Sequence, residues 1–245
     1  MIGLISALDE ELARFKQQLE FDQTVRQAGL DFHFGQLAGQ KVVLLKCGVG
    51  KVNAAVATQL LIDRFGVDSV VFTGLAGALV PTLRRGDVVV SNFVVQYDID
   101  LTAFGRRPGE LSEYSRLIEA DPTLVHTAAD AFESNFGVTD PDRQLVVGTI
   151  ATGDSFVSDP KRIRWLQREF GAVATEMEGG AVGQVCQMSR VPFVVIRVIS
   201  DSASGGAAAE FIMFLDEASD ITFRLVGAML SAWPETRAVR NLVPA

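Results

Sequence analysis

The chain has 245 residues, 48% of them hydrophobic, which is enough to bury the core of one large α/β domain or of two small ones. Its 30 acidic and 22 basic residues give a net charge of −8, which argues against a nucleic-acid partner, because neutralising phosphates requires clustered Lys and Arg. No apolar run reaches the roughly 20 residues of a membrane span, and Asp9, Glu10 and Glu11 interrupt the N-terminus before a signal peptide could form, so we expect no membrane partner.

Apolar segments with strand character alternate with amphipathic segments along the chain. In chain order, the first half predicts a strand over 2–6, a helix through Leu12, Phe15 and Leu19, strands over 32–37 and 42–45, a helix over 51–65, and strands over 69–73 and 87–95. The second half predicts helices over 122–136, 160–170, 178–188 and 210–233, separated by strands over 145–151, 172–175 and 191–199. Without an internal repeat or a linker, this alternation predicts one domain over 1–232, a three-layer α/β/α sandwich, and a weakly structured tail over 233–245.

Three stretches within these elements stand out. In the helix over 51–65, Val52, Val56 and Leu60 share one face. The strand over 69–73 is followed by Gly-Leu-Ala-Gly-Ala, which predicts a small-residue turn where the backbone can approach a ligand closely. The segment 97–115 lacks periodicity and predicts a long loop, and loops of that length in compact domains are often functional.

The few cysteine and histidine residues argue against metal chemistry. Cys47 and Cys186 both lie in apolar surroundings, so a disulfide framework or a cysteine-rich metal site is not expected, and a reducing cytoplasm is indicated. His33 and His126 are too isolated in the sequence to build a metal site. We therefore expect a cytoplasmic protein with neither a metal nor a cofactor.

Carboxylates follow several of the predicted strands at the point where the strand ends. Glu11 follows the first strand, Glu176 and Glu178 follow the strand over 172–175, and Asp201 follows the strand over 191–199. Each one alone has an ordinary explanation as a helix cap or as a partner of a helix dipole. Because the ends of parallel strands converge on one edge of a sheet, we expect these carboxylates to flank one pocket. Several carboxylates around a pocket suit hydrolysis of a glycosidic bond.

The run Gly48-Val49-Gly50-Lys51 partly matches a phosphate-binding loop. The full pattern requires a Gly five residues before the second Gly and Ser or Thr after the Lys, whereas Leu45 and Val52 occupy those places. The sequence therefore favours a tight turn between a strand and a helix over a nucleoside-triphosphate site, and no dinucleotide fingerprint opens the first helix.

Motifs spread over most of the chain resemble those of one known family. They are Ile2-Gly3 with Glu10-Glu11, Cys47 to Val52, Thr73 to Gly77, Thr102-Ala103-Phe104-Gly105, Thr152-Gly153-Asp154-Ser155-Phe156, Glu176-Met177-Glu178 and Arg197 to Asp201. From Ile2 to about Leu230 the chain resembles the 5′-methylthioadenosine/S-adenosylhomocysteine nucleosidases of the purine nucleoside phosphorylase-like superfamily. The resemblance implies a central mixed sheet of the nucleoside phosphorylase/hydrolase type, a nucleoside substrate with water as the second reactant, and a homodimer.

The resemblance also implies catalytic roles. Asp201, helped by Ser200, matches the general acid that protonates N7 of adenine, and Glu11 matches the base that orients and deprotonates the attacking water. Glu178 matches the carboxylate that binds the ribose hydroxyls, with Arg197 near the water and the ribose.

Further residues match the walls of the substrate site. Met177 is expected to pack under the sugar, Phe156 to stack on adenine, and the Val157 backbone to read the adenine edge. The remaining expected substrate-binding residues are Val49, Ala76, Gly77, Glu176, Phe211 and, reaching across from the partner subunit, Phe104. The chain departs from the family pattern at Leu75, where many members have Ser after Thr-Gly, and at Ser112, where they have Pro.

Three other functions share parts of this pattern. A nucleoside phosphorylase needs a cationic cradle for phosphate, whereas Glu11 would lie in that region and repel it. A 6-amino-6-deoxyfutalosine nucleosidase would use the same pocket chemistry on another 5′-substituted adenosine. A non-catalytic nucleoside-binding protein would need neither the proton donor Asp201 nor the water base Glu11.

Overall fold

The computed structural model describes residues 1–111, 115–137, 139–201 and 207–233, and for residues 207–213 it describes only the backbone. Its strands are β1 Ile2–Ser6, β2 Glu20–Gln27, β3 Leu30–Leu37, β4 Gln40–Lys46, β5 Ser69–Ala78, β6 Val88–Gln96, β7 Ile118–Glu119, β8 Leu145–Thr152, β9 Ala172–Glu176 and β10 Phe193–Asp201. Its helices are α1 Asp9–Gln18, α2 Lys51–Phe65, the 3₁₀ turn η1 Thr102–Phe104, α3 Pro122–Phe136, α4 Pro160–Phe170, α5 Gly179–Ser189 and α6 Ala207–Ser231. Residues 234–245 of the expected tail over 233–245, and Ser112, lie outside the described residues.

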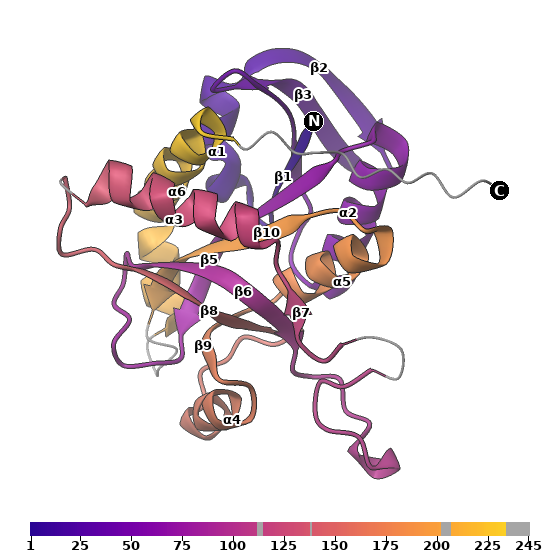
Figure 1. Ribbon diagram of the computed structural model, residues 1–245, viewed down its shortest axis with the longest axis vertical. Helices are drawn as coiled ribbons and strands as arrows, with labels where there is room; N and C mark the ends of the chain where they lie inside the picture. Colours follow the sequence, from indigo (N-terminus) through magenta and orange to yellow (C-terminus); the bar gives the residue numbers. More distant parts are fainter. Residues whose placement is uncertain (112–114, 138, 202–206, 234–245) are drawn as a thin grey trace.

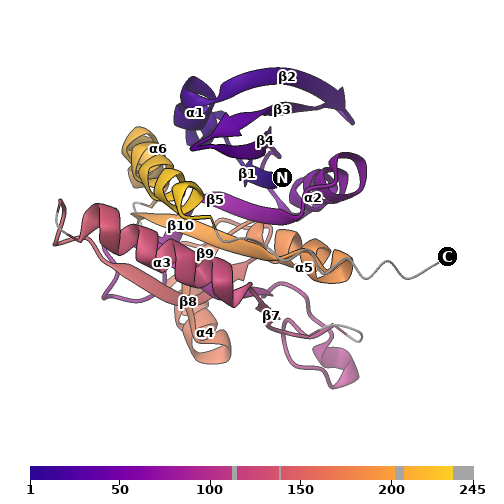
Figure 2. The same ribbon diagram turned by 45° about the horizontal axis from the view of Figure 1, so that its top comes forward.

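The strands form one mixed sheet with helices on both faces, which confirms the predicted sandwich (Figures 1 and 2). Helices α1, α3 and α6 cover one face, while α2 and α5 pack together on the other. Apolar residues of α1, α3 and α6 share one buried cluster with the sheet, and those of α2 and α5 share another. Helix α4 packs against β8 and β9. Each α-helix therefore buries one apolar face against the sheet.

The sheet closes on itself near the middle of the chain. β5 runs parallel to β1 and β10, whereas β6 is antiparallel to β10, and β8 and β9 follow the direction of β6. The end of β9 pairs with β5 in antiparallel fashion at Gly77 and Ala78, so five strands, β5, β10, β6, β8 and β9, close into a ring. The expectation that all the carboxylate-bearing strand ends meet as parallel neighbours is wrong for β9. This strand brings Glu176 to β5 from the opposite direction.

β5 is longer than predicted. The sequence predicts that the strand ends at Thr73, but β5 continues through the small residues to Ala78, paired with β10 on one side and β9 on the other. A Cβ atom on Gly74, whose φ is +154°, would lie 2.3 Å from Nη1 of Arg197 and 2.6 Å from Oε1 of Glu11. Small residues here give space to two buried charged side chains instead of forming a turn.

Two strands were not predicted. β2 has the sequence EFDQTVRQ and is largely exposed, so it lacks the alternation of apolar residues that identifies a half-buried strand. Among the described strands it pairs with β3 alone, and it lies at the edge of the sheet. The strand β7 has two residues. Pairing with a neighbour, which the local sequence does not encode, defines both strands.

Helix α2 has the predicted bounds but turns its valine face to solvent. Ala54, Ala57 and Leu61 are fully buried against the sheet, whereas Val52 and Val56 are 74% and 43% exposed.

Among the described residues, no helix combines the length and the apolar character required to cross a membrane.

Candidate active site

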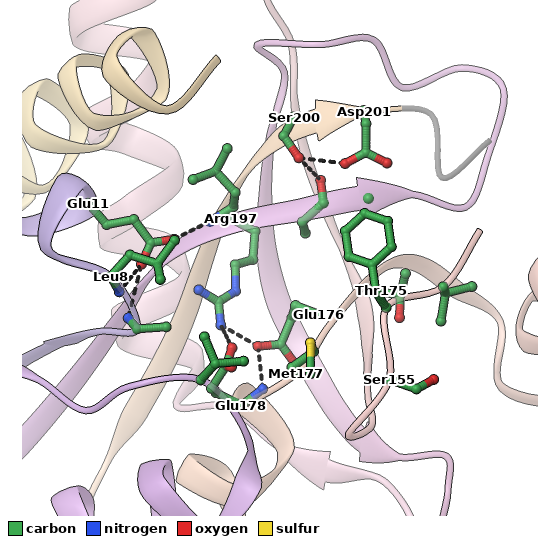
Figure 3. Close-up of a pocket in the computed structure, with 17 residues that line it drawn as sticks. Leu8, Glu11, Ser155, Thr175, Glu176, Met177, Glu178, Arg197, Ser200 and Asp201 are labelled. Atoms are coloured by element: carbon green, nitrogen blue, oxygen red, sulfur yellow. Dashed lines mark hydrogen bonds and ion pairs between the residues drawn. The ribbon is translucent and has the colours of Figure 1, made fainter. Parts of the chain in front are cut away.

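A cavity of about 400 Å³ lies where the ends of β1, β5, β9 and β10 meet (Figure 3). Most of its wall is apolar, and its charged groups are carboxylates and one guanidinium. It is lined by Ala7, Leu8, Glu11, Val49, Leu75, Ala76, Gly77, Ser155, Phe156, Val157, Thr175, Glu176, Met177, Glu178, Arg197, Ser200 and Asp201. A concave, mainly apolar site with a few convergent polar groups is typical of a small-molecule site.

Glu11 is held by backbone donors from two parts of the chain. One carboxylate oxygen accepts the N–H groups of Ala7 at 2.9 Å and Leu8 at 3.0 Å, and the other accepts the N–H of Leu75 at 3.1 Å. The ordinary explanation as a helix-start residue is therefore correct but incomplete, since the Leu75 contact fixes the carboxylate at the cavity. The Leu75 contact comes from the backbone, so it does not depend on a polar side chain at that position. Burial raises the pKa of Glu11, although the nearby Arg197 charge acts in the opposite direction.

Arg197 lies at the centre of the charged wall, with 1% of its surface exposed. Its Nη2 donates to Glu176 and lies 3.7 Å from Oε2 of Glu178, and its guanidinium carbon is 4.1 Å from the centre of the Phe72 ring. Burial alone would lower the pKa of Arg197, but the charges of Glu176, Glu178 and Glu11 raise it above its ordinary value. The guanidinium therefore stays charged in the protein interior.

Both oxygens of Glu176 are engaged by protein groups. One accepts the hydroxyl of Thr152, and the other accepts Arg197 and the N–H groups of Glu178 at 3.1 Å and Gly179 at 2.7 Å. Glu176 thus caps the start of α5 and fixes the guanidinium, while its side chain also lines the cavity.

Glu178 has fewer partners than Glu176. Its Oε1 accepts the N–H of Gly50 at 2.8 Å, where α2 begins, and Arg197 lies beside its other oxygen. Burial raises the pKa of Glu178, and repulsion from Glu176 adds to the effect, against the opposing charge of Arg197. Three carboxylates around one guanidinium leave this wall with an excess of negative charge when all are ionised. Such a wall stabilises positive charge that develops on a ligand.

Asp201 and Ser200 form a second polar group, on a different wall from Glu178 (Figure 3). The Ser200 hydroxyl donates to Oδ2 of Asp201 at 2.6 Å, and both residues are buried. The pairing of β10 with β5 shifts register between Ile199 and Asp201, and such irregularities re-aim side chains near functional sites. Asp201 ends β10, and helix α6 is described from Ala207 onward.

Most residues predicted for the site line this one cavity. They are Glu11, Val49, Ala76, Gly77, Phe156, Val157, Glu176, Met177, Glu178, Arg197, Ser200 and Asp201. Phe104 does not line it and is 83% exposed on the η1 turn, and the side chain of Phe211 lies outside the described residues. The predicted site residues did not include Ala7, Leu8, Leu75, Ser155 and Thr175, which also line the cavity. Ala7 and Leu8 directly follow β1, and Thr175 directly precedes Glu176 at the end of β9. Their positions at strand ends could have identified them from the sequence.

The described residues contain no group of His, Cys, Asp and Glu side chains arranged to hold a metal ion. Cys47 and Cys186 are both buried and free, and burial raises the pKa of each thiol. Their thiols are therefore poor nucleophiles and poor metal ligands.

The family model of the phosphorylase superfamily matches residues 1–231, which span the mixed sheet and the cavity. The 5′-methylthioadenosine/S-adenosylhomocysteine nucleosidase of Geobacillus thermodenitrificans is 42% identical over 94% of this chain and 95% of its own. The chain therefore belongs to the 5′-methylthioadenosine/S-adenosylhomocysteine nucleosidase family.

Two solved structures resemble the chain over nearly its whole length. The S. pneumoniae nucleosidase with the transition-state inhibitor MT-ImmA is 35% identical, with a TM-score of 0.88 over 95% of this chain and 99% of the other. Futalosine hydrolase of Helicobacter pylori strain 26695 is 33% identical, with a TM-score of 0.88 over 94% of this chain and 97% of the other.

The electrostatics of the charged wall can be tested by titration. We expect Glu178 to titrate above 4.5, the ordinary value, and Glu176→Gln to lower its pKa because the substitution removes the repelling charge. The measurement is a ¹³C NMR titration of the side-chain carboxyl groups, with Glu178 assigned from the Glu178→Gln spectrum. Glu110 is an internal reference, since hydrogen bonds from the Arg107 backbone and the Arg106 side chain lower its pKa. A Glu178 midpoint that is unaffected by Glu176→Gln would contradict this account.

Proposed function

We propose that this enzyme hydrolyses the N-glycosidic bond of 5′-methylthioadenosine and S-adenosylhomocysteine, releasing adenine and the 5-thioribose product. The observation that carries the proposal is the presence of two separate acidic groups in one cavity. The Glu11, Arg197 and Glu178 cluster lies on one wall, and Asp201 with Ser200 lies on another. Cleavage of a nucleoside needs this division, because the base must gain a proton while the sugar gains positive charge.

Asp201 is the proposed general acid. Adenine leaves poorly as an anion, and a proton delivered to N7 lets it leave as a nearly neutral molecule. The Ser200 hydroxyl, 2.6 Å from Oδ2, fixes the orientation of the Asp201 carboxyl. Phe156 and Val157 also line the cavity. Phe156 is proposed to stack on adenine, and the Val157 backbone to read the adenine edge.

Glu11 is the proposed base for the attacking water, and Glu178 the proposed acceptor of the ribose hydroxyls. The raised pKa of Glu11 suits a group that must take up a proton near neutral pH. The excess negative charge around Arg197 favours the oxocarbenium-like sugar in a site that is largely removed from water. Met177 is proposed to pack under the sugar, and Glu176 to hold Arg197 in place through the contacts described above.

The site favours water over phosphate as the attacking group. The N–H groups of Gly50 and Lys51 at the start of α2 are already bonded to Glu178 and Asp154, so they are not donors for an anion. Among the described residues that line the cavity, the only cation is Arg197, which Glu176 and Glu178 neutralise. A phosphate dianion entering here would meet Glu11 and Glu178.

A second candidate substrate is 6-amino-6-deoxyfutalosine. The likeness to Helicobacter pylori futalosine hydrolase over 94% of the chain supports it, because the base and ribose groups of the site serve any 5′-substituted adenosine. The proposed 5′ region contains Val49, which lines the cavity, and Phe104 of the partner subunit, and this region would distinguish these substrates. A purely nucleoside-binding protein is disfavoured, because binding alone requires neither a buried proton donor nor a water base.

We also propose that the enzyme is a homodimer in which Phe104 of the partner subunit completes the 5′ region. Phe104 is 83% exposed on a turn that projects from the body of the molecule (Figure 1). Val52 and Val56 of α2 and Met188 of α5 add exposed apolar surface on neighbouring helices. Apolar surface of this kind is typical of an interface. A cytoplasmic location is likewise our proposal, since both cysteines are free.

The substrate assay decides between these functions. We expect adenine release from 5′-methylthioadenosine and S-adenosylhomocysteine at rates that do not change when inorganic phosphate is added. The measurement is adenine release from these two nucleosides and from 6-amino-6-deoxyfutalosine, with and without phosphate. Turnover that depends on phosphate would identify a phosphorylase, and turnover of the futalosine derivative alone would replace the proposed substrate.

Asp201→Asn should lower adenine release by at least about 10²-fold, or roughly 2.7 kcal/mol in the barrier, because an amide can hydrogen-bond N7 but cannot protonate it. Nucleoside affinity should persist. The control is a nucleoside whose base leaves readily without protonation, which should be much less sensitive to the substitution. Turnover of 5′-methylthioadenosine within a few-fold of the parent would exclude Asp201 as the acid.

Val52→Asp should convert the dimer to monomer and reduce activity, because a charge at the interface is costly to bury and the monomer lacks the partner's Phe104. Light scattering after gel filtration gives the mass, and the same fractions are assayed for adenine release. Phe21→Asp is the matched control, because Phe21 is 62% exposed on the edge strand β2. A parent enzyme that is monomeric and fully active at micromolar concentration would refute the homodimer.

A further inference from the structure

Three segments that are distant in the sequence meet in a closed ring of hydrogen bonds. The Lys51 N–H donates to Oδ1 of Asp154 at 2.8 Å, and the Lys51 ammonium donates to Oδ1 of Asp98 at 2.6 Å. The N–H of Asp154 donates to the other oxygen of Asp98 at 3.0 Å, which closes the ring. Every bond has a charged partner, so each is stronger than a neutral hydrogen bond. None of the three side chains lines the cavity.

The ring joins the parts of the chain that carry two different subsites. Asp154 directly precedes Ser155 and Phe156 on the proposed base-binding side. Lys51 directly follows Gly50, whose N–H donates to Glu178, the proposed ribose ligand. Consecutive amides at the start of α2 are therefore bonded to the base loop and to the ribose carboxylate.

Gly50 allows this close approach. Its φ is +98°, a conformation that favours glycine, and a Cβ atom there would lie 3.3 Å from Oδ1 of Asp154. The start of α2 also favours negative charge, because its first N–H groups lack helical partners. Backbone conformation and helix polarity both stabilise the bond to Asp154.

We propose that Lys51, Asp98 and Asp154 are positioning residues that fix the base-binding loop relative to Glu178. The inference rests on the proposed function of the cavity. Cleavage requires N7 of the base at Asp201 while the sugar lies within the field of Glu178 and Glu11. A misplacement of about 1 Å can cost on the order of 10²-fold in rate. Through the rigid backbone of α2, the ring fixes the distance between the base-binding loop and Glu178.

The ring contributes little to global stability. The side chains of Lys51 and Asp98 are 18% and 30% exposed, and ion pairs that are partly exposed to water contribute little to the free energy of unfolding. The loop also has other supports, since the Tyr97 hydroxyl donates to the Ser155 carbonyl at 3.3 Å and the N–H of Gly153 donates to the Glu176 carbonyl at 3.2 Å. Loss of the ring should therefore disturb the position of the loop without unfolding the protein.

The chain offers a matched control in Arg143 and Asp140. This pair has a 2.8 Å bond between Nε and Oδ2 and side-chain exposures of 15% and 35%, close to those of Lys51 and Asp98, but neither residue lines the cavity. Asp140→Asn reports what loss of an ordinary partly exposed ion pair does to this protein.

The test compares Asp98→Asn, Asp154→Ala and Asp154→Asn with Asp140→Asn. We expect Asp98→Asn and Asp154→Ala to lower kcat/KM for 5′-methylthioadenosine about 10-fold or more, with kcat reduced as well as KM raised, and with melting temperatures close to that of Asp140→Asn. Asp154→Asn should recover part of the loss, because its amide oxygen still accepts the Lys51 N–H. Kinetic effects no larger than those of Asp140→Asn would overturn the proposal.

A second readout does not depend on turnover. Hydrogen exchange of the 153–159 segment, followed by mass spectrometry, should become faster in Asp98→Asn and Asp154→Ala but not in Asp140→Asn. A parent enzyme that fails to cleave any of the nucleosides contradicts the proposed function, whereas unchanged exchange in this segment contradicts the positioning role. The Lys51→Met, Asp98→Asn double variant should lose less activity than the product of the two single losses, because both substitutions act on the bond between Lys51 and Asp98.

Discussion

The buried guanidinium of Arg197 is the constraint on which the rest of the site depends. Taking this charge out of water costs several kcal/mol unless it is paired, and removing one partner of a buried pair leaves an uncompensated charge. Glu176 provides the hydrogen-bonded partner, Glu178 lies 3.7 Å away, and the Phe72 ring covers one face. Glycine at position 74 leaves the space that Arg197 and Glu11 share. The position of every carboxylate on this wall is therefore linked to a single cation.

Backbone N–H groups hold these carboxylates in place. Ala7, Leu8 and Leu75 donate to Glu11, Gly50 donates to Glu178, and the start of α5 donates to Glu176. Backbone donors have fixed directions, so the site does not have to reorganise when charge develops on a bound sugar. The same donors allow like charges to lie close together, since each one compensates part of the cost of burying a carboxylate. Elements that form ordinary helix starts thus also build the charged wall of the cavity.

Local sequence signals predicted the helices well because the signals are themselves local. Helices α2, α3 and α4 have the predicted bounds. Asp121 and Asp159 accept N–H groups at the starts of α3 and α4, each followed by Pro, while Gly66 and Gly171 adopt the left-handed conformation after α2 and α4. Strand β2 and the second half of β5 had no such signal. One is polar and exposed, and the other is made of small residues whose strand conformation depends on two neighbouring strands.

The sequence by itself determined the alternation of strands and helices, the carboxylates that follow the strands, and the motifs that identify the family, because each depends on residues close together in the chain. Only the tertiary structure decided that β9 meets β5 from the opposite direction, that Glu176 bonds Arg197 while Glu178 bonds the start of α2, and that Asp201 lies on a different wall. These features depend on contacts between residues far apart in the sequence. Burial also raises the pKa values of Glu11 and Glu178, and burial is defined only when the whole chain has folded around them.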